Sequence, residues 1–164
     1  MSPNKNNPKN EETSRFTASC NKAEENALKL IARAEQTTQG LTAKLERKGF
    51  DLPVIREVIS GLLDRGLLDD ERYAVLWLRS RLAKQAQSPK WLLLSLRKRG
   101  IDRHSSKKAL EKVLDPETEY SLLLKYIEKL VKTFKNTEEA PPRALLKHEG
   151  FSVESLDRYF NLFW

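Results

Sequence analysis

Three glycines at nearly equal intervals constrain this chain of 164 residues more than any other feature. Gly49, Gly100 and Gly150 are separated by 51 and 50 residues, and a leucine precedes each glycine by four positions. A large apolar residue and then a short polar residue follow each glycine. The leucines are Leu45, Leu96 and Leu146, and the following pairs are Phe50-Asp51, Ile101-Asp102 and Phe151-Ser152. Glycine commonly ends a helix, and Asp or Ser commonly begins one, so the fixed period predicts a repeated helical unit.

The segments between these glycines have the apolar periodicity of helices. Apolar residues recur every three or four positions, and no segment alternates with a period of two, so we predict an all-α fold without a sheet. Two clear apolar stripes are Ile55, Val58, Ile59, Leu62 and Leu63, and Tyr120, Leu123, Leu124, Ile127, Val131 and Phe134. The helix signals predict nine helices in three tandem three-helix repeats. These repeats span residues 22–68, 69–115 and 116–164.

The first 21 residues differ in composition from the rest of the chain. Residues 1–21 are rich in Asn, Lys, Glu and Ser and contain few apolar side chains, so we predict a disordered tail. The single cysteine, Cys20, cannot form an internal disulfide. No segment has the apolar length of a signal peptide core or a bilayer span, and we expect a cytoplasmic protein that does not bind membranes.

The residues that usually carry catalysis are scattered. His104 and His148 lie in separate repeats without a cysteine partner, so they do not predict a zinc site. The six glycines occur singly, which excludes a glycine-rich phosphate loop. Residues 69–71, Asp-Asp-Glu, begin a predicted helix, where acidic side chains favourably oppose the helix dipole, and we favour this role over metal binding. We predict no enzyme, no cofactor and no metal.

Positive charge is concentrated in the middle repeat. The formal net charge is +7, and residues 69–115 carry twelve basic and six acidic side chains, while the other repeats are close to neutral. A solvated surface explains part of this excess, but its concentration favours contacts with phosphates or with an acidic protein surface. The candidate partner-binding residues are Arg79, Arg81, Lys84, Lys90, Arg97, Lys98, Arg99, Arg103, Lys107 and Lys108.

The aromatic residues fall mostly on apolar stripes, so we predict that they pack in the core rather than stack on nucleobases. They are Tyr73, Trp77, Trp91, Tyr126 and Phe160. Trp91 fits this role least well because it lies early in a short basic helix.

Two motifs resemble those of a known family. Residues 45–50 read Leu-Glu-Arg-Lys-Gly-Phe, and residues 66–74 read Gly-Leu-Leu-Asp-Asp-Glu-Arg-Tyr-Ala. Together with the second leucine-to-glycine segment, residues 96–101, they resemble the RecX family of recombinase regulators. The resemblance covers about residues 23–164 and is most specific over 41–114. The family often has a glycine where residues 86–89 of this chain read Ala-Gln-Ser-Pro.

The resemblance implies that the three repeats form an elongated, curved array. It also implies a monomeric regulator without an active site, acting in DNA repair, recombination and the SOS response. Its expected partner is the RecA-type recombinase filament on single-stranded DNA, whose extension, ATP hydrolysis and strand exchange it would modulate, mostly by inhibition. The alternative is a stand-alone protein that binds single- or double-stranded DNA through helix-turn-helix-like three-helix modules.

Overall fold

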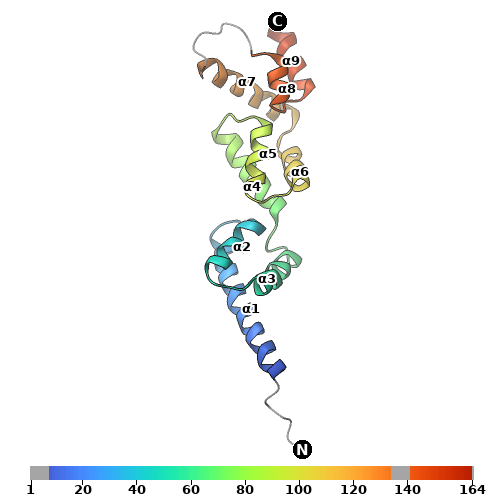
Figure 1. The fold of residues 1–164 in the computed structure, drawn as a ribbon. Coiled ribbons are helices and arrows are strands. Elements are labelled where there is room, and N and C mark those ends of the chain that lie inside the picture. Colours follow the sequence, from blue (N-terminus) through green and yellow to red (C-terminus); the bar gives the residue numbers. More distant parts are fainter. Residues whose placement is uncertain (1–7, 134–140, 164) are drawn as a thin grey trace, which may run out of the picture. The chain divides into compact units, whose positions relative to one another are not determined.

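A computed structural model describes residues 8–133 and 141–163, and these residues form nine α-helices and no strand. The all-α prediction is therefore confirmed. The helices are α1 (Pro8–Arg33), α2 (Thr38–Arg47), α3 (Leu52–Asp64), α4 (Asp70–Lys84), α5 (Pro89–Arg97), α6 (Arg103–Val113), α7 (Pro116–Thr133), α8 (Arg143–His148) and α9 (Val153–Phe163) (Figure 1). The chain divides into two compact units, residues 1–70 and residues 71–164. The elongated, curved array remains a prediction.

Helix α1 is longer than its composition suggested. The predicted disorder over residues 1–21 is wrong for residues 8–21, which are helical, whereas residues 1–7 lie outside the described residues. The stretch from Lys9 to Ala18 is helical and exposed, so the helix forms there without burial. Its exposed side chains make local bonds instead: Thr13 and Thr17 each donate a hydroxyl to the carbonyl four residues earlier. A low content of apolar residues limits burial, but the backbone hydrogen bonds of a helix form within the segment itself.

The first unit is a three-helix bundle in which α1 and α2 pack against α3. Ala23 and Ala27 of α1 are fully buried, which allows its backbone to approach the larger side chains of its partners closely. Those partners share complete or nearly complete burial and are Leu41, Leu45, Val54, Ile55, Val58, Ile59, Leu62 and Leu68. Leu63, which the predicted stripe placed inside, is exposed; its neighbour Leu62 occupies the buried face.

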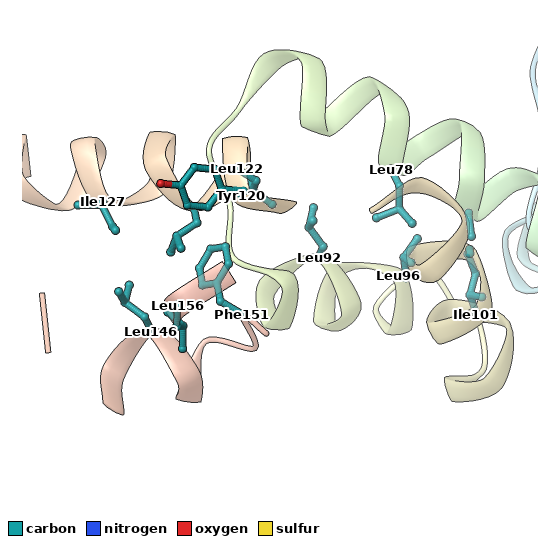
Figure 2. Packing of buried hydrophobic residues seen from close by; sticks show 13 residues of the cluster. Leu78, Leu92, Leu96, Ile101, Tyr120, Leu122, Ile127, Leu146, Phe151 and Leu156 are labelled. Atoms are coloured by element: carbon teal, nitrogen blue, oxygen red, sulfur yellow. The ribbon is translucent and has the colours of Figure 1, made fainter. Parts of the chain in front are cut away.

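In the second unit, two groups of three helices share one hydrophobic core. We call α4–α6 the middle group and α7–α9 the last group. Leu78, Leu92 and Leu96 of the middle group belong to the same buried cluster as Leu146 and Leu156 of the last group. Figure 2 shows the labelled side chains of both groups in this cluster. The two groups therefore fold as a single compact unit.

The aromatic and apolar stripes of this unit follow the prediction in part. Tyr73, Trp77, Tyr126 and Phe160 pack against the core and are partly buried, whereas Trp91 is 42% exposed. On α7 two predicted core residues, Leu124 and Val131, are exposed, and Leu122 is buried instead. Leu122 belongs to the same buried cluster as Leu78 and Leu92 of the middle group. Phe134, also predicted on this stripe, lies outside the described residues.

The three periodic glycines end their helices in the same way. Gly49, Gly100 and Gly150 have φ angles of 85°, 81° and 93°, in the left-handed region. In each case the glycine N–H donates to the carbonyl three residues earlier, at 2.8–3.0 Å, and the next N–H donates to the carbonyl of the preceding leucine, at 3.2–3.3 Å. This pair of bonds is a Schellman motif. The leucines involved, Leu45, Leu96 and Leu146, are all fully buried, so the predicted period corresponds to a recurring packed helix end.

Candidate partner-binding surface

The candidate surface is built at the junction between α5 and α6. After α5 the chain turns at Gly100 and buries Ile101. The Asp102 carboxylate then begins α6 by accepting hydrogen bonds from the His104 and Ser105 N–H groups, at 2.8 and 3.0 Å. The C-terminal end of α5 and the N-terminal end of α6 thus lie close together, and the two helices pack against each other.

A groove of about 890 Å³ follows this junction. Leu93, Leu94 and Leu110 contribute to its apolar lining, together with Pro89 and Ile101, and His148 and Gly150 of the last group border it. Four of the ten basic residues predicted to bind a partner also line it: Lys90, Arg97, Arg103 and Lys107. A volume of this size is within the range of ligand-binding clefts and exceeds the space of a single side chain.

The last group fixes one end of the groove. The Lys90 backbone N–H donates to the Glu149 carbonyl at 3.0 Å, and the Ser88 hydroxyl donates to the Glu149 carboxylate at 2.6 Å. The Lys90 ammonium lies 3.2 Å from both ring nitrogens of His148. These contacts hold the N-terminus of α5 against the end of α8.

One acidic side chain, Asp102, lies among the basic residues that line the groove. Its carboxylate also accepts a hydrogen bond from the Ser105 hydroxyl, at 2.6 Å. The hydrogen bonds from the hydroxyl and backbone of Ser105, together with one from the His104 backbone, lower the pKa of Asp102 below its usual value. Because this carboxylate caps α6, its oxygens are already engaged within the protein.

Two other predicted basic residues lie around an aromatic side chain. The guanidinium carbon of Arg99 is 4.5 Å from the centroid of the Trp77 ring, and that of Arg81 is 5.3 Å away. Trp91 stacks on the same ring, with the two centroids 6.5 Å apart. Arg99 also donates to the Ser95 carbonyl at 2.8 Å. These arginines therefore help to hold the indole of Trp77, a role that the sequence did not reveal.

The four remaining predicted basic residues occupy two kinds of environment. Lys108 forms an ion pair with Glu71 at 2.9 Å, and Lys112 binds the other carboxylate oxygen of Glu71. Glu71 of α4 therefore holds both lysines of α6, and the three side chains together keep one net positive charge. Arg79, Lys84 and Lys98 are exposed and do not line the groove.

Within residues 8–133 and 141–163, no group of three or more His, Cys, Asp or Glu side chains could hold a metal ion. Among the same residues no helix has both the length and the apolar character needed to cross a bilayer.

Two family models match the chain. The model described as the first three-helix domain of RecX matches residues 23–62, and that of the second three-helix domain matches residues 69–110. A regulatory protein RecX from Treponema pallidum is 36% identical over 115 residues, which cover 70% of each chain. The chain belongs to the RecX family.

Solved structures show the same fold. A crystal structure of RecX from Lactobacillus salivarius aligns with a TM-score of 0.71 at 22% identity, covering 89% of this chain and 97% of that one. A second crystal structure of a regulatory protein RecX aligns with a TM-score of 0.76 at 21% identity, covering 98% of this chain and 80% of the other.

Membership of the RecX family makes this chain a regulatory, non-enzymatic protein. All four groove-lining basic residues lie in the segment that matches the second RecX domain, whereas His148 and Gly150 lie beyond both matched segments. The leucines of the groove and His148 were not among the predicted site residues. Leu92, Leu93 and Leu94 form an unbroken apolar run, so sequence alone did not separate the buried Leu92 from its groove-lining neighbours.

Proposed function

We propose that this RecX family member binds the filament that a RecA-type recombinase forms on single-stranded DNA, and that it limits filament extension, ATP hydrolysis and strand exchange. The observation that carries the proposal is the grouping of Lys90, Arg97, Arg103 and Lys107 along one groove of the second RecX domain. A nucleoprotein filament presents phosphates and acidic side chains, and a basic groove is complementary to both. The cytoplasm, where chromosomal DNA is repaired, is the compartment that this proposal implies.

The ten basic residues are not expected to contribute equally to partner binding. Arg81 and Arg99 are engaged with Trp77, and Lys108 with Glu71, so these three contribute less to an intermolecular contact than their number suggests. Arg97 and Lys107 are exposed and line the groove. Their side chains are therefore the most direct targets for substitution.

The DNA-dependent ATPase rate of a RecA-type recombinase, measured with increasing amounts of this protein, tests the proposal. The wild type is expected to lower the rate, and the double variant Arg97→Glu, Lys107→Glu is expected to require about tenfold more protein for the same inhibition. The double variant Lys125→Glu, Lys132→Glu makes the same change in charge on α7, outside the groove, and is the matched control. Circular dichroism must show unchanged helical content for both variants.

A rate that stays constant at every ratio of regulator to recombinase would show that the proposed function is wrong. Equal inhibition by the two variants would remove the groove from the contact surface. Affinity for DNA without recombinase that falls steeply with salt concentration would favour the stand-alone DNA-binding alternative.

A further inference from the structure

The lining of the groove is both apolar and basic, and this distinguishes it from a surface that contacts only phosphate groups. Leu93, Leu94 and Leu110 line the same space as the four basic side chains. Leu94 is 45% exposed, although it lies on a helix whose opposite face is fully buried. An apolar surface that is rimmed by charge is typical of a protein-binding site.

The lining contrasts with the surfaces that bind single-stranded nucleic acid. Such surfaces combine cations with aromatic rings on which bases stack. No Trp, Tyr or Phe lines this groove within the described residues, because Trp77 and Trp91 stack with each other elsewhere in the middle group. Sugar and phosphate groups would leave the leucines in contact with water, whereas aliphatic side chains would bury them.

The floor also contains a polar group without a partner. Ser106 lines the groove and is 1% exposed, and its hydroxyl makes no hydrogen bond to the part of the protein that the structure describes. A buried hydroxyl without a partner lowers stability. The floor of the groove is therefore not optimised for stability alone, as expected of a surface that a partner completes.

We propose that this groove binds an acidic amphipathic peptide segment of a partner protein, with its apolar side chains on the leucines and its carboxylates on the basic rim. An amphipathic helix that places its apolar face in a groove is a common mode of peptide recognition. Arg97 and Arg103 supply guanidinium groups suited to paired contacts with carboxylates, and Lys90 and Lys107 add two further positive charges. The inference rests on the proposed function only in taking the partner to be the protein component of the filament rather than its DNA.

The test uses the full-length protein and a fluorescein-labelled peptide of about 15 residues, with leucines at positions i, i+3, i+4 and i+7 and glutamates at most other positions. Fluorescence anisotropy measures binding. Two control probes are the same peptide with its leucines replaced by serine, and an oligothymidine of similar length. The wild type is expected to bind the leucine-containing peptide at least about tenfold more tightly than the serine peptide.

Matched variants separate the groove from the rest of the surface. Leu94→Gln is expected to weaken peptide binding about tenfold, whereas Leu76→Gln, which alters an equally exposed leucine of α4 outside the groove, is expected to leave it unchanged. Arg97→Glu with Lys107→Glu is likewise expected to weaken peptide binding, and Lys125→Glu with Lys132→Glu is not. Each of these residues is exposed, so loss of folding does not explain the expected differences.

Several outcomes would overturn the inference. These are no preference for the leucine peptide over the serine peptide, equal binding by Leu94→Gln and Leu76→Gln, or oligothymidine binding that depends on Arg97 and Lys107 and excludes the peptide. Failure of the peptide assay leaves the recombinase ATPase result intact, and failure of the ATPase assay leaves the peptide result intact. The two proposals can therefore fail separately.

Discussion

Gly150 combines a left-handed backbone with a close approach to the middle group, so replacing it with alanine gives a sharp test of the structure. Its φ angle is 93°, and a Cβ atom at this position would lie 3.3 Å from the backbone nitrogen of Lys90. That nitrogen is held by its hydrogen bond to the Glu149 carbonyl, so it cannot move away easily. The substitution therefore adds both backbone strain and a close contact.

The expected magnitude follows from these two effects. A left-handed conformation costs an L-residue roughly 1–2 kcal/mol. Overpacking against a fixed neighbour typically adds about 1–3 kcal/mol. Gly150→Ala is therefore expected to lower the free energy of unfolding of the second unit by roughly 2–5 kcal/mol.

Gly49 provides the control because it has the same backbone conformation without the contact. Its φ angle is 85°, and nothing lies within 4 Å of a Cβ atom placed there. Gly49→Ala is thus expected to destabilise the first unit by roughly 1–2 kcal/mol, the backbone strain alone. Both values come from urea denaturation. Tryptophan fluorescence follows the second unit, which contains all three tryptophans. Far-UV circular dichroism follows the helices of both units, so the transition that it shows and fluorescence does not belongs to the first unit. If the two substitutions cost the same, the close packing of Gly150 on α5 is wrong.

Two further substitutions test the packing and the capping of the middle group. Leu96→Ala truncates a fully buried side chain at the end of α5 and should lower the free energy of unfolding of the second unit by about 2–5 kcal/mol, measured by urea denaturation; a loss well below 1 kcal/mol would contradict its burial. Asp102 has a pKa lowered by its bonds to Ser105 and the His104 backbone, so its capping stabilises α6 above the unfolded-state pKa near 3.8 and is lost as pH falls through the lower folded-state value. Acidification through this range should therefore destabilise the second unit of the wild type more than that of an Asp102→Asn variant, as thermal unfolding at a series of pH values would show; identical pH dependence would count against the cap.

Local signals were well predicted because they depend on neighbouring residues. The Gly49, Gly100 and Gly150 helix ends need only a left-handed glycine and a buried leucine within the same turn. The predicted helix starts gave a similar result: Asp102 and Ser152 accept backbone hydrogen bonds at the starts of α6 and α9. Asp51 occupies the predicted position before α3, but its side chain makes no capping hydrogen bond.

Helix periodicity and cap signals did not predict contacts between residues that are distant in the sequence. The hydrogen bonds from Ser88 and Lys90 to Glu149 join residues about sixty positions apart, and no periodicity encodes them. The pairing of Lys108 with Glu71 is similar, because a basic residue on one helix face gives no indication of the acid opposite it. For this reason the ten basic residues formed one set in the sequence but occupy several environments in the structure.

The junction between the middle and last groups links stability to the proposed binding surface. The bond from the Lys90 backbone to Glu149 and the close approach of Gly150 fix the position of α5 relative to α8. The same junction brings His148 to within 3.2 Å of the Lys90 ammonium, at the border of the groove. A basic groove on α5 and α6 alone would end where α5 begins. Packing of the last group extends it, so the proposed binding surface includes His148 and Gly150 of the third three-helix group although the basic rim lies in the second.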